Sequence, residues 1–249
     1  VYYMENFLSS LISDVIIFLL GVILSRLFHI VTFTIPSRRV WGLKSPKELV
    51  VCCANSVITD TGEYHRPATG IGEARSLSLL ATSLSQTYGK IDFSKFYLST
   101  DQIHKYIEND LIILGGDKTN ELASRLLRII EKEQPLKMKG CDFYWRKNNN
   151  GIWIDEGAEN FRGNTFDYDV VSDYGVIVRV KSPFSSLPKT VILLAGSHTY
   201  GTLAASKFFT EKHLHKNIAF TKKDNIVILL RCEVINGYPT SLEVIKTYK

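Results

Sequence analysis

The sequence of 249 residues lacks most of the short motifs that identify enzymes and metal proteins. It has no HExxH helix, nucleophile elbow, Walker loop, kinase signature or recognisable carboxylate pair, so no catalytic residue is assigned. The four cysteines form no CxxC pair, which argues against a zinc site, and we expect neither a metal nor a cofactor. The adjacent thiols of Cys52 and Cys53 fit a reducing cytosol.

A long apolar run near the start is the most informative feature that is present. Residues 7–35, FLSSLISDVIIFLLGVILSRLFHIVTFTI, are numerous enough to cross a bilayer core of about 30 Å as a helix. No Lys or Arg precedes the run, whereas Arg38, Arg39 and Lys44 follow it. Because basic flanks stay on the cytoplasmic side, we expect a single pass through the inner (plasma) membrane with the carboxy-terminal domain in the cytoplasm. The missing basic leader also argues against a cleavable signal peptide.

Charged residues inside the run leave its detailed role open. Asp14 and Arg26 bracket the uncharged core, so the span could cover residues 7–27 or 15–35. A buried core helix of a soluble protein and an interfacial helix remain alternatives. If Asp14 lies deep in lipid, self-association is the natural way to hide it, and we expect a homo-oligomer.

The formal net charge of +5 limits the choice of partners. Part of the basic excess lies at residues 38–47, next to the apolar run, where it would favour anionic lipid. It is therefore weak evidence for binding nucleic acid. We expect membrane lipid as a partner and no nucleic acid.

The remaining chain has the pattern of one α/β domain. We divide it into a transmembrane anchor over residues 1–35, a basic tether over 36–47 and a cytosolic α/β ligand-binding domain over 48–249. The expected fold is Rossmann-like, with a mixed sheet, helices on both faces and a β-rich second half. Helical spacing predicts helices over 73–88, 100–109, 120–133 and 202–212, and a long polar loop covers 55–72. Apolar runs predict strands over 48–54, 95–98, 110–114, 174–180, 190–195, 225–233 and 241–248, and an Asn-Asn-Gly sequence predicts a hairpin within 140–170.

Three glycine-containing loops precede helices and carry the candidate site. They cover residues 69–75, 115–120 and 195–202. Because the carboxyl ends of parallel strands share one edge of a sheet, we expect these loops to meet there. Free N–H groups at a helix start attract phosphate, so the combination favours a nucleotide-like ligand, although any one loop alone is more often a structural turn. The expected ligand-binding residues are Gly70, Gly72, Glu73, Arg75, Gly115, Gly116, Lys118, Asn120, Ser197, His198, Thr199 and Thr202.

Individual residues in these loops have competing interpretations. Arg75 and Lys118 would pair with phosphate, but Lys118 could equally be an exposed turn lysine. Glu73 could be a ribose ligand, a catalytic carboxylate or a first-turn acid that balances the helix dipole. His198 could be a general base, stack on a base or bond to the backbone. Asp173, before a predicted strand, is interpreted only as part of a possible turn.

The order of anchor, basic tether and nucleotide-pocket domain resembles the membrane effectors of bacterial nucleotide-signalling antiphage defence systems. This resemblance covers the whole chain at the level of architecture. It implies a sensor that binds a nucleotide-derived second messenger, changes its oligomeric packing and acts on the membrane through its helices. We favour such a binding protein. A membrane-tethered enzyme that hydrolyses or transfers a nucleotide or N-glycosidic substrate, with acid–base work by Glu73 or His198, remains open, as does a scaffold without a small ligand.

Overall fold

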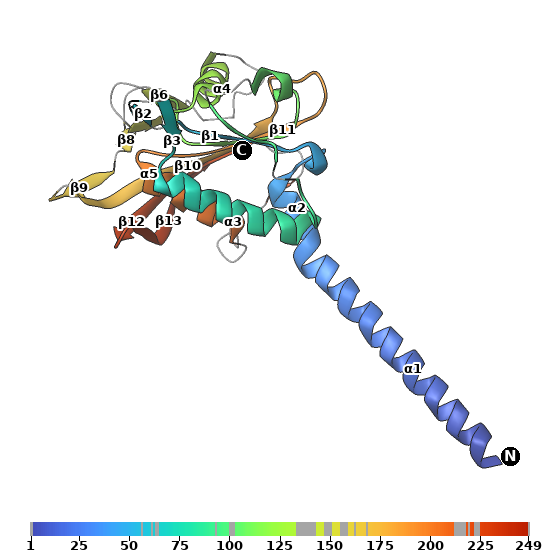
Figure 1. Cartoon of the computed structure of the whole chain (residues 1–249). Helices are drawn as coiled ribbons and strands as arrows, with labels where there is room; N and C mark the ends of the chain where they lie inside the picture. The colour runs from blue at the N-terminus through green and yellow to red at the C-terminus, as the bar shows by residue number, and fades with distance from the viewer. Residues whose placement is uncertain are drawn as a thin grey trace.

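The protein consists of a mixed α/β domain from which a long amino-terminal helix projects (Figure 1). A computed structural model provides the coordinates. It describes residues 2–55, 57–60, 62, 65–92, 94–99, 103–132, 143–146, 151–154, 159–161, 163–167, 169–211, 218, 220–221 and 225–248.

The domain is built on an eight-stranded mixed sheet with the order β13-β12-β10-β11-β5-β1-β4, and β9 pairs with β10. Parallel pairing joins the four neighbouring strands β4, β1, β5 and β11. Antiparallel pairing joins β10 to β11, β12 and β9, and β12 to β13. This confirms the expected α/β class with a mixed sheet. The strands are β1 Val50–Cys53, β4 Phe96–Leu98, β5 Leu111–Leu114, β9 Asn164–Phe166, β10 Asp169–Lys181, β11 Thr190–Gly196, β12 Ile226–Ile235 and β13 Tyr238–Tyr248.

The central strands are apolar without interruption because both faces of the sheet are covered. Every residue of β1, β5 and β11 is buried. Helix α4 (Glu121–Lys132) covers one face, and α3 (Ile71–Tyr88) and α5 (Thr199–Thr210) lie side by side on the other (Figure 1). The core therefore forms two clusters, one containing Leu126 of α4 and the other Leu84 of α3 and Phe209 of α5.

The amino-terminal helix is long and apolar enough to cross a membrane. Helix α1 (Tyr2–His29) continues through a π-helical turn, η1 (Ile30–Thr34), into α2 (Ile35–Trp41). The apolar segment Leu11–Trp41 contains an 18-residue window of which none is buried, so this part of the helix is not a core helix of the domain. In a regular helix a proline lacks an N–H and clashes with the carbonyl four residues earlier, and the wide π turn ends two residues before Pro36.

The sequence assigns residues 36–47 to a basic tether, but residues 36–41 belong to α2, which packs on the domain. Trp41 is 1% exposed and meets the ring of Phe209 edge to face, with centroids 5.0 Å apart. The buried Arg179 guanidinium donates from Nη1 to the carbonyls of Arg39 and Val40, each at 2.7 Å. The apolar helix therefore joins the domain through a packed junction.

The smaller elements differ in part from expectation. Two strands, β6 (Phe143–Arg146) and β7 (Gly151–Ile154), form the predicted hairpin, and β8 (Glu159–Phe161) extends it to three strands. The helix expected over 100–109 is only a 3-10 turn, η3 (Ile103–Tyr106), within the described residues. The expected long loop contains an antiparallel pair, β2 (Val57–Asp60) and β3 (His65–Ala68). The sequence Val-Ile-Thr in β2 is β-branched throughout, which favours a strand. A further 3-10 turn, η2, covers Pro46–Glu48.

Candidate functional site

The three glycine loops meet at the carboxyl edge of the parallel strands. The chain passes from β1 to β4 on one side and then to β5 on the other, so the strand order reverses between β1 and β5. Ligands of open α/β sheets bind in the crevice beside such a reversal. At this point Gly115, with φ +92°, follows β5, and a Cβ placed on it would lie 3.7 Å from Oε1 of Glu73. We call this edge, formed by Gly70–Glu73, Gly115, Asp173 and Ser197–Thr199, the rim.

Glu73 is a buried carboxylate at the rim. It lies in the first turn of α3, is 5% exposed, and accepts a hydrogen bond at Oε2 from Thr199 Oγ1 at 2.7 Å. The same hydroxyl oxygen accepts the N–H of Gly72 at 2.9 Å. Residue 72 must be glycine because a Cβ there would collide with the backbone carbonyl of Thr199. Glu73 and Thr199 thus join the first turns of α3 and α5.

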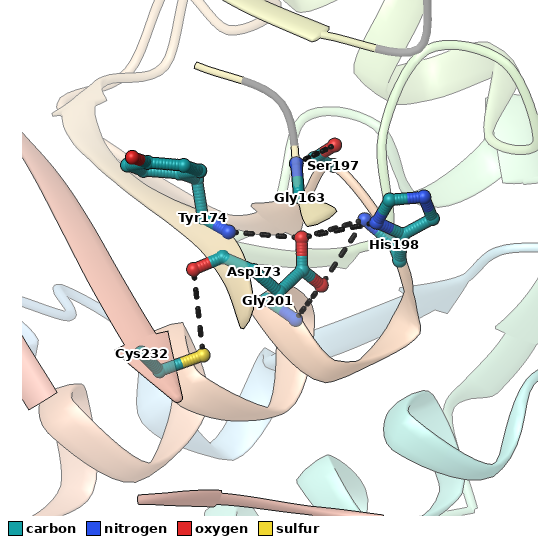
Figure 2. A network of polar contacts seen from close by, with 7 residues as sticks. All are labelled: Gly163, Asp173, Tyr174, Ser197, His198, Gly201 and Cys232. Atoms are coloured by element: carbon teal, nitrogen blue, oxygen red, sulfur yellow. Dashed lines mark hydrogen bonds and ion pairs between the residues drawn. The ribbon is translucent and has the colours of Figure 1, made fainter. Parts of the chain in front are cut away.

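Asp173 forms a second buried carboxylate, and the network around it is drawn in Figure 2. This residue is completely buried and accepts N–H bonds from Tyr174, His198 and Gly201. Its Oδ1 also lies 3.3 Å from Nδ1 of His198, whose side chain is 25% exposed. Nδ1 of His198 therefore faces a carboxylate, and the rest of the ring extends away from Asp173 (Figure 2).

The Asp173 carboxylate was missed by the sequence interpretation, which treated it as part of a turn. It reaches the start of α5 because β10 pairs antiparallel with β11, which aligns Gly175 with Gly196. A Cβ at Gly175 would collide with the carbonyl of Gly201, so this strand and α5 approach closely. In the sequence, Asp173 is visible only as an acidic residue two positions before Gly175 in a strand. Its role becomes evident only once the pairing of β10 with β11 is known.

Asn120 has a structural role at the start of α4. Its Oδ1 accepts the N–H groups of Leu122 and Ala123, at 3.1 and 3.2 Å, which is N-capping. Its Nδ2 donates to the carbonyl of Leu114 at 3.0 Å and to that of Cys52 at 3.3 Å. The side chain, 1% exposed, therefore ties the ends of β5 and β1 to the helix.

These contacts revise the expected place of a phosphate. The start of α5 already holds the Asp173 carboxylate, and the start of α4 already holds the Asn120 amide. Gly72 N at the start of α3 donates to Thr199. A phosphate placed on α5 would meet a buried negative charge as well as occupied donors. The helix starts are therefore poor anion sites.

The other expected residues are distributed unevenly. Ser197 lies at the rim, where its Oγ accepts the N–H of Gly163 at 3.1 Å. Thr202 is buried within α5, and Lys118 is an exposed turn residue. Gly116 accepts the N–H of Asn120 at its carbonyl. Gly70 is the N-cap of α3.

Arg75 does not face the same way as Glu73. Two residues along a helix turn the side chain by about 200°. The Arg75 guanidinium accordingly lies on the side of the β12–β13 turn, where Nη1 donates to the carbonyl of Gly237 at 2.7 Å. Its Cζ lies 4.1 Å from the centre of the Tyr238 ring. Arg75, one of the two cations expected to pair with phosphate, therefore lies away from Glu73.

The chemistry of the rim suits hydrogen-bond donors more than anions. It presents two buried carboxylates, the hydroxyls of Ser197 and Thr199 and an imidazole. Burial raises the pKa of Cys53 strongly, with Cys52 and Glu73 adding to the shift, so this thiol stays neutral and is no nucleophile. Among the described residues, no group of three His, Cys, Asp or Glu side chains is placed to hold a metal ion.

No protein-family model, curated protein or solved structure matches the chain. The features that bear on function are the geometry of the rim and its connection to the amino-terminal helix through α3 and α5.

Proposed function

We propose that the chain is a membrane-anchored sensor and effector whose α/β domain binds a nucleotide-derived second messenger at the rim. The ligand shifts the packing of the amino-terminal helices in oligomers and so acts on the inner membrane. The architecture-level resemblance suggests bacterial antiphage defence as the setting. Membrane lipid is the second partner, through α1 and the basic residues that follow it.

One observation carries this proposal: the two helices whose first turns form the rim are the same two whose last turns hold α2. Helix α3 has 18 residues, a length of about 27 Å. At its end, the carbonyl of Thr87 accepts Arg38 Nε at 3.4 Å, and Arg38 lies over the Tyr88 ring at 5.6 Å. Figure 1 shows α3 running beneath the sheet toward α2.

Helix α5 makes the second connection. It begins at Thr199, which is bonded to Glu73, and near its end Phe209 packs on Trp41. A ligand that alters the Glu73–Thr199 contact therefore acts on both helices at once. Such a change has an effect only if the ligand binds one arrangement more tightly than the other.

The donor and acceptor groups of the rim favour the ribose part of a nucleotide. Sugar hydroxyls donate hydrogen bonds, and carboxylate oxygens accept them. Oε1 of Glu73 lies toward Gly115, and the Ala54 side chain packs against the same glycine. His198 extends from the same edge, and its side chain is 25% exposed.

Binding can be tested on the full chain in lipid nanodiscs by isothermal titration calorimetry. The panel contains cyclic mononucleotides, cyclic dinucleotides and ADP-ribose. We expect at least one to bind with micromolar affinity, and Glu73→Gln to weaken that binding about tenfold or more. Glu243→Gln is the matched control, because Glu243 is exposed on β13. The proposal is wrong if no member of the panel binds at millimolar concentration.

An enzyme is the second candidate, and the Asp173–His198 pair favours it. A buried carboxylate that holds Nδ1 fixes the imidazole in the orientation that a general base needs. Incubating the full chain with NAD and with nucleosides, followed by chromatography of the products, tests this candidate. Turnover that is lost in His198→Gln supports a hydrolase, whereas binding without turnover supports the sensor.

A further inference from the structure

A groove on the helical face of the domain lies apart from the carboxylates of the rim. It has a volume of about 300 Å³ and runs between α3, α5 and the start of β13. Its walls are formed mainly by Arg75, Leu79, Leu203, Lys207, Tyr238 and Pro239. Cavities of about 300 Å³ are at the small end of the range for small-molecule sites.

The Arg75 guanidinium is held in place before any ligand arrives. Nη1 donates to the Gly237 carbonyl at 2.7 Å, and the group stacks over Tyr238 at 4.1 Å. The carbonyl is presented by a tight turn in which Asn236 and Gly237 both have positive φ, of 51° and 71°. A guanidinium has five N–H donors, and this bond uses one of them. The remaining donors form the flat fork that binds carboxylate or phosphate.

A second cation comes from α5. Lys207 lines the same groove, and Glu211, one turn later, supplies one carboxylate, so the charged groups named here sum to one positive charge. The rim differs in the sign of its charged groups, because it contains the buried carboxylates of Glu73 and Asp173. Within the described residues, the groove is therefore better suited to an anion than the helix starts are.

The rest of the groove is apolar and aromatic. Leu203 is 3% exposed, Pro239 is buried and Leu79 is half-buried. Tyr238 is 55% exposed, with Arg75 over its ring. An exposed aromatic ring beside fixed cations is the arrangement on which a nucleobase stacks while its phosphate pairs with Arg or Lys.

From these contacts we propose that the groove binds the phosphate and base of a mononucleotide unit, with Arg75 and Lys207 on the phosphate and Tyr238 beside the base. This deepens the proposed function and rests on it, because a signal with more than one nucleotide unit would place one unit here and the ribose of another at the rim. Tyr200, the residue after Thr199, lies beside the turn that precedes Tyr238: a Cβ on Gly237 would lie 3.6 Å from its hydroxyl. The rim lies at the first turns of α3 and α5, and the groove lies farther along the same two helices.

The test uses the full chain in nanodiscs and three probes, AMP, adenosine and inorganic phosphate, measured by calorimetry. AMP is expected to bind at least tenfold more tightly than adenosine, and phosphate to compete with AMP. Arg75→Gln and Lys207→Gln are each expected to weaken AMP about tenfold and to leave adenosine unchanged. Arg128→Gln, an exposed arginine on the opposite face, is the matched control and should bind AMP like the unaltered chain.

Arg75→Gln could disturb the fold, because Arg75 also bonds to the β12–β13 turn. Lys207→Gln therefore provides a second test of the groove that leaves this bond in place. Equal affinities for AMP and adenosine would overturn the inference, as would unaltered AMP binding in both groove variants or no AMP binding at millimolar concentration. The proposed function is judged separately, by the cyclic nucleotide panel and by Glu73→Gln. A panel member that binds and depends on Glu73 but not on Arg75 or Lys207 would refute the groove alone.

Discussion

Replacing Arg179 by methionine should release the amino-terminal helix from the domain. Arg179 is 2% exposed, and its guanidinium donates at 2.7 Å to the carbonyls of Arg39, Val40 and Thr221. It also lies 5.2 Å from the centre of the Phe220 ring. Each charge-assisted bond contributes about 1.5–3 kcal/mol, and the cost of burying the guanidinium cancels part of that sum. We expect a net loss of about 3–5 kcal/mol, a large share of the about 5–15 kcal/mol that stabilises a typical domain.

The fluorescence of Trp41 measures whether the junction between α2 and the domain opens, because Trp41 is buried there against Phe209. With Trp145 and Trp153 replaced by phenylalanine, Trp41 is the single tryptophan of the chain. Arg179→Met should shift its emission to longer wavelength and lower the urea midpoint. Arg39→Met is the matched control, because Arg39 is an exposed cation on the same helix. Unchanged emission together with a stability within about 0.5 kcal/mol of the parent would refute the packed junction.

Three further predictions concern the rim and its neighbours. Thr199→Val removes the hydroxyl between Glu73 and the N–H of Gly72, and should lower the free energy of unfolding by about 1–3 kcal/mol in urea titrations. Asn120→Ala removes the cap of α4 and should cost about 1–2 kcal/mol or more in thermal melts, whereas Lys118→Ala, at an exposed position, should change stability by less than about 0.5 kcal/mol. Burial, with a smaller contribution from Asp173, raises the pKa of Cys232 to about 12 from 9.0, so the folded thiol binds its proton more tightly. Its contribution to stability is then complete below pH 9 and lost as the pH rises toward 12, which urea midpoints across that range will measure.

The strands and the meeting of the loops were predictable because they depend on local sequence and one general rule. The sequence of β5 is a continuous apolar run, which predicts a buried parallel strand. The glycines after it predict a turn at the carboxyl end of that strand. Gly115 and Glu73 then lie close together because the strand order reverses between β1 and β5. The length and apolar character of α1 were likewise visible in the sequence.

Other features depend on contacts between distant segments and could not be predicted in the same way. Asp173 reaches α5 only through the antiparallel pairing of β10 with β11. The docking of α2 depends on Arg179, 140 residues from Arg39 in sequence. The direction of Arg75 could have been predicted, since helical geometry places it away from Glu73, but its carbonyl partner comes from the β12–β13 turn.

Titrating the chain that has Trp41 as its only tryptophan with the nucleotide panel tests most directly whether the rim controls the helix junction. The account predicts a saturable change in Trp41 emission with the same midpoint as the calorimetric binding curve. In Thr199→Val, binding should produce a smaller change, because the contact that joins the first turns of α3 and α5 is gone. Saturable binding that leaves Trp41 emission unaltered would contradict the coupling, and an absence of binding would contradict the sensor itself.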